Sequence, residues 1–231
     1  MSKRVAIVQS SYVPWKGFFD LIRSVDEFIL LDEVQFTRRD WRSRNRIKTQ
    51  HGVAWLTVPV QTKGRYHQSI EETVVADSRW AARHWATLGA AYARAPFFDD
   101  YAEDIARLYE GRRPEERLSE VNHAFIVALC ELTGINTPIS WSSAYGAREG
   151  RNERLVDLCR SAGATDYLSG PSARDYLDET QFAEAGIRVQ FADYSGYPEY
   201  PQVHPPFEHG VSMLDLLFCA GPDAVRYMKR L

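Results

Sequence analysis

Cysteine is scarce in this sequence, and its spacing excludes a disulfide framework and a thiol-based metal site. Cys130, Cys159 and Cys219 lie far apart in a chain of 231 residues, and no Cys-x-x-Cys pair occurs. Disulfide-stapled domains and zinc ribbons need closely spaced cysteines. Two of the three lie in helical patterns among apolar neighbours, so we expect free thiols in the core of a protein from a reducing compartment.

Long apolar segments are also missing. No apolar run approaches the roughly 20 residues that cross a bilayer, and the first residues, MSKRVAIVQSS, lack the apolar stretch of a secretion signal. We therefore expect a soluble cytoplasmic protein. The six histidines have no metal-ligand spacing, and no motif of a covalent nucleophile occurs, so the sequence predicts no metal site and specifies no cofactor.

Neither sign of charge is in large excess. Lys and Arg number 28 and Asp and Glu 31, which gives a formal net charge of −3. General nucleic-acid binding is typical of basic domains. The balance therefore favours an anionic small molecule, such as a nucleotide or nucleotide sugar, while tRNA remains an alternative partner.

The N-terminal quarter has the pattern of a strand–helix–strand unit. Arg4–Gln9 is a short β-branched run, apolar residues repeat at helical spacing from about Lys16 to Ser24, and Phe28–Leu31 is a second apolar run. A similar alternation returns after residue 138. These patterns predict a Rossmann-like α/β fold with a mostly parallel sheet, in one domain over residues 1–231, with a helical subdomain at about 78–134.

Further elements are expected between and after these units. Ile47–Thr49 and Val53–Val60 are expected to form a hairpin, and Ile70–Val75 a further short strand. In the C-terminal part we expect strands at Pro138–Trp141, Asp166–Ser169 and Ile187–Phe191. The remaining ranges are expected to be helical and comprise the region from Ser78 to an interruption at Pro96, Asp99–Tyr109, Leu118–Leu132, Asn152–Ala162, Ala173–Leu177, Phe182–Ala185 and Ser212–Phe218.

The stretch Asp32–Arg46, DEVQFTRRDWRSRNR, is the densest group of cations. Its five arginines are Arg38, Arg39, Arg42, Arg44 and Arg46. It follows an apolar strand, and ligands of open α/β sheets bind at the carboxyl edge of the strands. Guanidinium groups pair with phosphate or carboxylate through two parallel hydrogen bonds, so we assign Arg38, Arg44 and Arg46 to phosphate binding. The alternative is a solvated loop whose arginines pair with its own acidic residues.

The loop after the first expected strand is a second candidate. In QSSYVPWKG, the hydroxyls of Ser10 and Ser11 lie just before a helix N-terminus, where the helix dipole favours an anion. We assign Gln9, Ser10 and Ser11 to substrate binding, with Tyr12 and Trp15 as pocket walls. The alternative is that the serines cap the helix and Trp15 packs in the core.

Polar residues elsewhere supply candidates for catalysis. Asp32 directly follows the second strand and is expected to orient or deprotonate an acceptor group; its alternative is to anchor an arginine. Gln35 and Asn45 of the same stretch complete the predicted catalytic group. Asp215 is an isolated carboxylate in an apolar helix, which we expect to pair with a buried arginine or to cap a loop.

A third loop candidate is Ser169-Gly170, between an expected strand and an expected helix. It is a second place where phosphate could bind. An ordinary strand-to-helix turn explains the same pattern.

Together these motifs resemble the WbqC-like family over nearly the whole chain. The matching segments are Gln9, Tyr12-x-Pro14-Trp15-x-Gly17-Phe18-Phe19-Asp20, Asp26-x-Phe28, Leu31-Asp32-x-Val34-Gln35-Phe36, Trp41, Arg44-Asn45-Arg46-Ile47, Trp55-Leu56-Thr57-Val58-Pro59-Val60, Tyr167-Leu168-Ser169-Gly170, Tyr176-Leu177 and Ser212-x-Leu214-Asp215-Leu216-Leu217-Phe218. Ser10 and Val8 depart from the family pattern, which often has proline and histidine there. The resemblance implies an association with O-antigen or other surface-polysaccharide biosynthesis.

Three functions follow as hypotheses. The first is a transferase that makes an amide or acyl modification of a nucleotide-linked amino sugar in glycan or natural-product biosynthesis. The second is transfer from an adenylate or an aminoacyl-tRNA, whose acceptor stem would contact Lys48, Lys63, Arg65 and Arg83. The third is a non-catalytic binding protein of a polysaccharide assembly.

Overall fold

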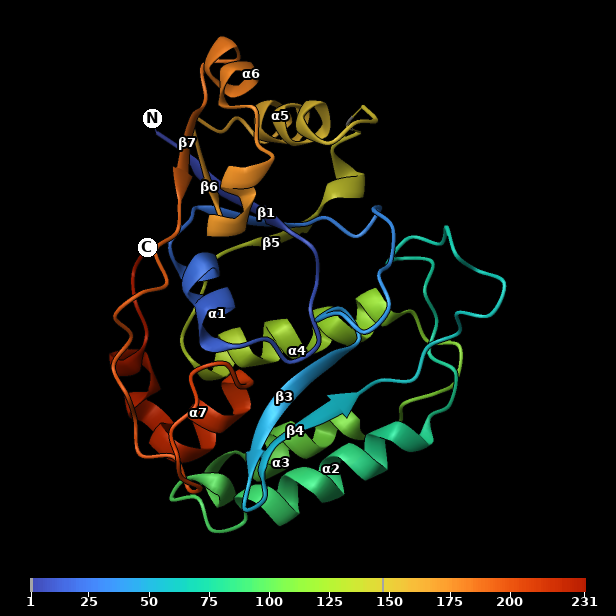
Figure 1. The fold of residues 1–231 in the computed structure, drawn as a ribbon, viewed down its shortest axis with the longest axis vertical. Helices are drawn as coiled ribbons and strands as arrows, with labels where there is room; N and C mark the ends of the chain where they lie inside the picture. Colours follow the sequence, from blue (N-terminus) through green and yellow to red (C-terminus); the bar gives the residue numbers. More distant parts are fainter. Residues whose placement is uncertain (1, 147) are drawn as a thin grey trace.

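A five-stranded parallel sheet forms the centre of the molecule (Figure 1). The structure, a computed structural model, describes residues 2–146 and 148–231. The strand order is β5-β2-β1-β6-β7, and every neighbouring pair is parallel. The strands are β1 (Arg4–Val8), β2 (Glu27–Leu30), β5 (Ile139–Trp141), β6 (Asp166–Ser169) and β7 (Arg188–Phe191). The predicted Rossmann-like α/β fold is confirmed.

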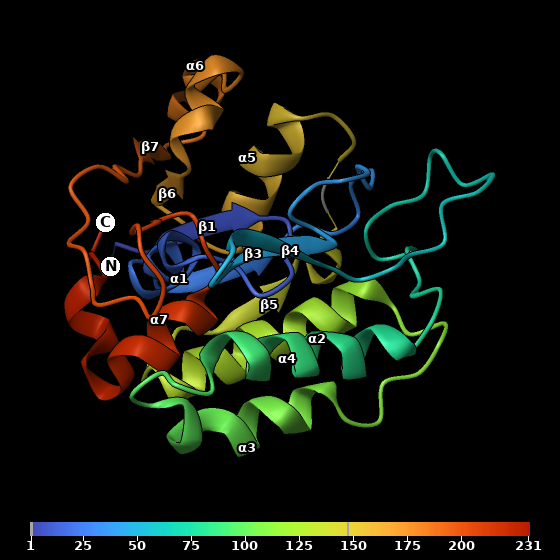
Figure 2. The same cartoon turned by 60° about the horizontal axis from the view of Figure 1, so that its bottom comes forward.

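Helices cover both faces of this sheet. Figure 2 shows α2, α3 and α4 packed side by side on one side of the sheet, with α5 and α6 on the other. The helices are α1 (Lys16–Arg23), α2 (Arg79–Tyr92), α3 (Phe98–Tyr109), α4 (Leu118–Leu132), α5 (Asn152–Ser161), α6 (Glu179–Glu184) and α7 (Met213–Ala220). Helices α2 to α4 lie within the range expected to be helical, between β2 and β5 in the sequence.

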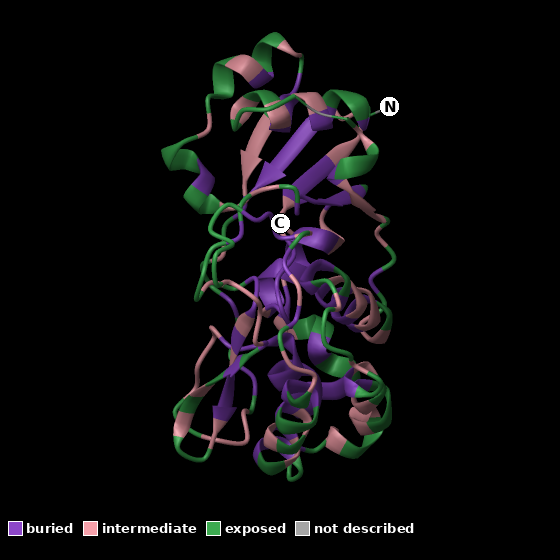
Figure 3. Cartoon of the chain, turned by 90° about the vertical axis from the view of Figure 1, so that its right-hand side faces the viewer, coloured by how far each residue is buried: buried purple, intermediate pink, exposed green. Residues whose placement is uncertain are grey.

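The strand residues alternate between two apolar clusters. Val5, Ile7 and Ile29 pack with α5 and α6, whereas Ala6 and Phe28 pack in the larger cluster that contains α1 to α4 and α7. This is the period-2 geometry of a strand. Because both faces are covered, β2 and β6 are buried over their whole length, as is usual in parallel sheets. They are buried in Figure 3.

A separate two-stranded hairpin extends from the sheet towards α2 (Figure 1). It consists of β3 (Arg44–Thr49) and β4 (Gly52–Thr57), paired antiparallel. The predicted hairpin is therefore confirmed, although β3 begins three residues earlier than the pattern indicated. Ile47 and Leu56 face the core and are buried, while Trp55 on the opposite face is exposed.

Two local predictions were wrong. Residues 70–75 form turns joined to other segments by isolated bridges, not a strand. The apolar pattern there reflects the burial of Ile70 and Val75, which a loop packed on the core achieves equally well. Ala173–Leu177 forms no α-helix; a 3-10 helix covers Pro171–Asp175.

The strand order places β1 at the topological switch point. From β1 the chain proceeds outward through β2 to β5, then returns to the other side of β1 as β6 and β7. Open α/β sheets bind ligands at the carboxyl ends of the strands next to such a point. The loops that follow Val8, Leu30 and Ser169 are therefore the expected place for a site.

The three cysteines lie in the core, as expected. Cys130, Cys159 and Cys219 are free and buried, and burial raises the pKa of each thiol to about 12. Such thiols are unreactive core residues. Within the described residues, no helix combines the length and apolar composition needed to cross a membrane.

Candidate functional site

The first loop, residues 9–15, adopts a strained conformation held by contacts from three directions. Val13 has a φ of +35°, which a β-branched residue rarely adopts. Around it, Tyr12 N donates to Trp41 O at 3.0 Å, Asn45 Nδ2 donates to Tyr12 O at 3.0 Å, and Met213 N donates to Pro14 O at 2.8 Å. Strain of this kind persists only where the surroundings fix the backbone, and it is concentrated at functional sites.

A cavity of about 320 Å³ opens beside this loop, at the carboxyl end of β1. Its volume is at the lower end of the range of about 300–1,000 Å³ for ligand sites. The lining residues come from β1, the first loop, α1, the arginine-rich stretch, β3 and the loop before α7. They are Val8, Ser11, Pro14, Trp15, Phe18, Trp41, Arg42, Asn45, Arg46 and Gly210.

Arg42 is the most buried cation of this cavity. It is only 9% exposed, and its Nη1 donates to Gln9 Oε1 at 2.6 Å. Its Nε has no hydrogen-bond partner among the described residues. Burial lowers the pKa of the guanidinium from its usual value, and the charges of Asp40 and Asp32 oppose this shift. A nearly buried cation is costly unless an anion pairs with it, so the position of this guanidinium in the cavity lining favours an anionic ligand.

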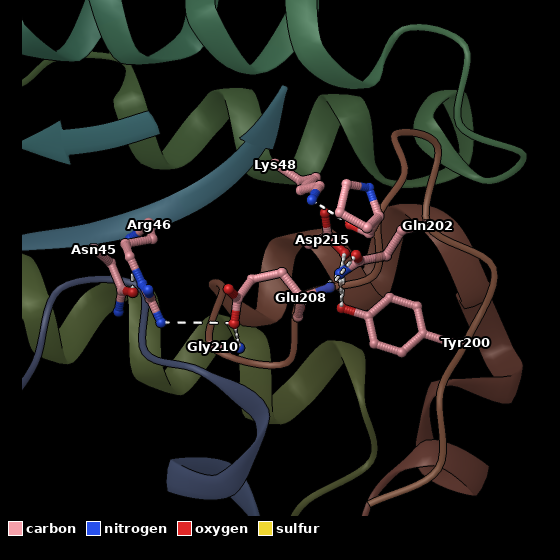
Figure 4. Close-up of polar contacts among 9 residues, drawn as sticks. Asn45, Arg46, Lys48, Tyr200, Gln202, Glu208, Gly210 and Asp215 are labelled. Atoms are coloured by element: carbon pink, nitrogen blue, oxygen red, sulfur yellow. Dashed lines mark hydrogen bonds and ion pairs between the residues drawn. The ribbon is translucent and has the colours of Figure 1, made fainter. Parts of the chain in front are cut away.

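Arg46 contributes a second guanidinium. Its Nη2 lies 3.8 Å from Glu208 Oε1, a loose ion pair drawn in Figure 4. Its Nε likewise lacks a partner within residues 2–146 and 148–231. A Cβ added at Gly210 would lie 2.0 Å from Arg46 Nη2, so the glycine leaves the space that this guanidinium occupies.

The loop that carries Glu208 is anchored by the buried carboxylate of Asp215. Asp215 accepts hydrogen bonds from Tyr92 and Tyr200, both at 2.7 Å, and from Gln202 Nε2 at 2.8 Å. Gln202 exchanges hydrogen bonds with the backbone of Glu208, both at 2.9 Å (Figure 4). Burial raises the pKa of Asp215, and its tyrosine and glutamine donors oppose this.

Of the two roles expected for Asp215, pairing with a buried arginine is wrong, whereas capping a loop is closer to what the structure shows. Its partners are two tyrosines and a glutamine, and it anchors the β7–α7 loop, residues 192–212. Lys48 Nζ also donates to Pro206 O in this loop. Through the chain from Asp215 to Gln202, Glu208 and Arg46, the core of α7 sets the position of a cavity arginine.

Four of the predicted site residues come together in the cavity lining. They are Ser11, Trp15, Asn45 and Arg46. Asn45 is 2% exposed and bridges two elements, because its Oδ1 accepts from Arg46 N at 2.8 Å while its Nδ2 binds the first loop. Its side chain thus holds the cavity walls together.

Gln9, Ser10 and Asp32 lie behind Arg42. Ser10 N donates to Asp32 Oδ1 at 2.7 Å, and Ser10 Oγ accepts from Asn122 Nδ2 at 3.0 Å. Asp32 is 2% exposed. Burial raises its pKa, and hydrogen bonds from Ser10 and the charge of Arg42 oppose this. These residues support the cavity from outside its lining.

Tyr12 does not wall the cavity as expected. It is fully buried, and its hydroxyl lies 2.9 Å from both His84 Nδ1 and Tyr109 Oη. Burial lowers the pKa of His84 to about 4, so this imidazole is neutral at physiological pH. The side chain thus belongs to the helical part of the core.

Three other predicted residues lie away from the cavity. Arg38 and Gln35 are exposed and donate to Thr62 O at 2.7 Å and Tyr66 O at 2.9 Å. Arg44 stacks on Trp55, with its guanidinium carbon 4.0 Å from the ring centroid.

Ser169 and Gly170 end β6 beside β1 but lie outside the cavity lining. Ser169 is buried, and its hydroxyl donates to Tyr167 Oη at 3.3 Å. Gly170 precedes the 3-10 helix at Pro171–Asp175. An ordinary strand-to-helix turn describes their local structure.

Sequence reasoning missed several cavity residues. Arg42 and Trp41 were noted within the stretch but not assigned to the site, and Gly210 and Asn122 were not considered. Asn122 of α4 is fully buried, and its Nδ2 also donates to Arg42 O at 2.9 Å. A buried asparagine inside an apolar helix was the available signal, since buried amides are normally hydrogen-bonded.

Comparison with known proteins identifies the family of this chain. The sequence model of the WbqC-like protein family matches residues 9–227, a range that includes the first loop, the arginine-rich stretch and Asp215. The chain belongs to the WbqC-like protein family. It is similar to uncharacterized protein Rv1507c of Mycobacterium tuberculosis (strain ATCC 25618 / H37Rv), with 49% identity over 227 residues that cover 98% of each chain. No solved structure matches.

The cavity thus combines cations with flat apolar walls. Arg42 and Arg46 supply guanidinium groups, and Trp15 and Trp41 supply indole surfaces. In the part of the chain that the structure describes, no cluster of three or more His, Cys, Asp or Glu side chains has a metal-binding arrangement. Guanidinium groups beside flat apolar walls suit a small molecule that carries phosphate or carboxylate beside a less polar ring.

Proposed function

We propose that this WbqC-like protein is a transferase that binds a nucleotide-linked amino sugar and acylates its amine. The observation that carries the proposal is Arg42, a nearly buried guanidinium that lines the cavity together with Arg46. A phosphate group bound between the two guanidinium groups would accept charge-assisted hydrogen bonds from both. Placement at the switch point of the sheet supports the same assignment.

Each neighbouring residue has a role in this proposal. Arg42 and Arg46 hold the phosphate, and Trp15 packs against the sugar ring. Asp32 is assigned to positioning Arg42, because it is 2% exposed and lies behind that residue. Preorganised cations and orientation supply most of the rate enhancement in such sites.

Glu208 is assigned as the proton acceptor. It is ion-paired with Arg46 at 3.8 Å, and Oε1 also accepts from Gly210 N at 2.7 Å. In the transfer, the amine nitrogen forms a bond to the acyl carbon, the bond from that carbon to its leaving group breaks, and the amine proton passes to Glu208. An adenylate or another activated acyl donor supplies the acyl group.

A tRNA-linked donor receives less support. Of the four basic residues expected to contact an acceptor stem, Lys48 is 3% exposed and bound to Pro206 O. It therefore cannot belong to an exposed basic surface. Lys63, Arg65 and Arg83 are exposed.

The proposal is tested by the nucleotide-sugar pools of the native host. We compare cells that lack the gene with cells complemented by wild type, Arg46→Gln or Arg39→Gln, using liquid chromatography and mass spectrometry. We expect the deletion and Arg46→Gln to accumulate a non-acylated nucleotide-linked amino sugar, and Arg39→Gln to restore the wild-type pool. Unchanged pools in the deletion strain would refute the proposed reaction.

A further inference from the structure

The outer face of the β3–β4 hairpin carries exposed aromatic rings beside cations. Trp41 is 41% exposed and Trp55 45% exposed, their ring centroids are 5.4 Å apart, and their planes are inclined by 36°. Arg44 lies over Trp55 at 4.0 Å. Indoles are large apolar groups, and an exposed pair of them usually marks a surface that another molecule covers.

The strand register explains why these groups share one face. Asn45 and Ile47 of β3 point to the core and are buried, so Arg44 and Arg46 point outward. Trp55 is the cross-strand partner of Arg46. The hairpin therefore holds two guanidinium groups and an indole in a fixed pattern on a rigid element.

This face is continuous with the cavity. Trp41 and Arg46 both line the cavity, and the guanidinium carbon of Arg46 lies 5.7 Å from the centroid of the Trp41 ring. Trp41 in turn contacts Trp55. A ligand that leaves the cavity past Arg46 therefore meets the indole of Trp55 next.

The cavity is too small to enclose a whole nucleotide-linked sugar, so a part of such a substrate lies outside it. The cavity of about 320 Å³ is at the lower limit for sites that enclose drug-sized ligands, whereas a nucleotide-linked sugar has a sugar, two phosphates, a ribose and a base. Building on the proposed function, we propose that the Trp41–Trp55–Arg44 face is a nucleobase subsite. The base stacks on the part of the Trp55 indole that Arg44 and Trp41 leave exposed, the diphosphate lies across Arg46, and the amino sugar enters the cavity.

The chemistry of the face fits a base in particular. Every nucleobase has a flat π surface that stacks on an indole, and such stacking is tolerant of base identity. Arg44 donates to oxygen or nitrogen atoms at the edge of a stacked base or to a neighbouring phosphate. The net charge of −3 favours this small ligand over a long polyanion such as RNA.

Calorimetric titration of uridine diphosphate and inorganic pyrophosphate tests the subsite. The proteins are wild type, Trp55→Thr and the control Val53→Thr, which changes an exposed residue of the same strand and face. Thr suits an exposed strand position, so the hairpin is retained. Circular dichroism melting compares the folding of the three proteins.

For wild type and Val53→Thr we expect uridine diphosphate to bind about tenfold more tightly than pyrophosphate. Trp55→Thr should lose this preference while keeping its affinity for pyrophosphate. If wild type binds both ligands equally, or Trp55→Thr keeps the preference, the nucleobase subsite is wrong and the phosphate site in the cavity stands. If wild type binds neither ligand, the proposed function fails as well.

Calorimetric titration of a single-stranded RNA hexanucleotide tests whether the face binds RNA instead of a small nucleotide. Three results together would assign the face to an RNA end. Wild type would bind the RNA more tightly than uridine diphosphate, the binding would depend on Trp55, and it would weaken steeply between about 50 and 200 mM salt. That result would overturn the proposal. Weaker binding than that of uridine diphosphate would support it.

Discussion

Lys16 illustrates how differently buried cations are used in this chain. It is 2% exposed, and its Nζ lies 4.7 Å from the Tyr197 ring centroid, 5.1 Å from that of Tyr200 and 3.3 Å from Pro198 O. Burial lowers its pKa to about 8, and the charges of Asp20 and Asp215 oppose this. Unlike Arg42, Lys16 is surrounded by aromatic rings and a carbonyl, so we interpret it as a structural residue of the β7–α7 loop contact.

This environment predicts a pH dependence of stability. The folded chain binds the Lys16 proton less tightly than the unfolded chain, whose lysine pKa is near 10.5. The resulting penalty is complete below about pH 8 and is relieved as pH rises towards about 10.5. Relative to Lys16→Met, wild type should therefore gain stability between about pH 7 and 10.

Urea unfolding at both pH values measures this difference, with Lys63→Met as the control for loss of an exposed lysine. A stability difference between wild type and Lys16→Met that stays constant with pH would contradict the assignment.

Single residues also show where sequence reasoning reached its limit. Ser11, Trp15, Asn45 and Arg46 were identified because they lie near the ends of recognisable strands. Arg42 was left unassigned, whereas Arg38, Arg44 and Arg46 were assigned to phosphate binding. The burial of Arg42 depends on contacts with Gln9 and Asn122, which are 33 and 80 residues away in the chain, and no local pattern reports such contacts.

Among the elements, the β3–β4 hairpin has the clearest local cause. Gly52 begins β4 after the turn with a φ of +100°, and a Cβ added there would meet nothing within 4 Å. The glycine is therefore required by backbone conformation alone. Residues with side chains rarely adopt this conformation without strain.

Two glycine substitutions should have opposite effects. Gly52→Ala should lower the free energy of unfolding by about 1 kcal/mol, because alanine is strained at positive φ. Gly89 lies within α2, where an added Cβ also meets nothing, and Gly89→Ala should raise it by about 0.5–1 kcal/mol. Urea denaturation of both variants checks the signs; shifts of the same sign would show that the two glycines serve other roles.

Helices and strands were predicted correctly where the buried apolar residues recur with the period of the element. The parallel strands and the α4 range follow from apolar runs and helical spacing. Ile70–Val75 failed because a loop packed on the core has the same apolar residues as a strand. Only the hydrogen-bond partners distinguish the two, and those partners are far away in sequence.

At the scale of the whole molecule, one core joins the sheet to the helices between β2 and β5. The larger apolar cluster includes Ala6 of β1, Ile47 of β3, Leu88 of α2, Ile126 of α4 and Leu217 of α7. These elements share buried surface that none can cover alone. The single domain over residues 1–231 stays a prediction from the sequence, and this shared core supports it.

Thermal unfolding tests that prediction. If the helical subdomain depends on the sheet, the chain should unfold in one cooperative transition with equal calorimetric and van't Hoff enthalpies. Differential scanning calorimetry measures both quantities. Two resolved transitions would show that residues 78–134 form a separate folding unit.

The overall architecture could be predicted, whereas the assembly of the site could not. The βαβ pattern predicts which strand ends meet, and the candidate cavity lies at that edge of the sheet. The β7–α7 loop and the hairpin reach that edge through long-range contacts of Asp215, Gln202 and Glu208. Pro- and Tyr-rich loop sequences have no period from which such a path follows.

The central claim is that Arg42 and Arg46 together bind the phosphate of a small molecule. Its most direct test is calorimetric titration of a uridine diphosphate-linked amino sugar into wild type, Arg46→Gln and the control Arg39→Gln. We predict that Arg46→Gln weakens binding about ten- to a hundredfold, the usual effect of removing a charged hydrogen bond, while Arg39→Gln binds like wild type. Equal affinities of wild type and Arg46→Gln would contradict the claim.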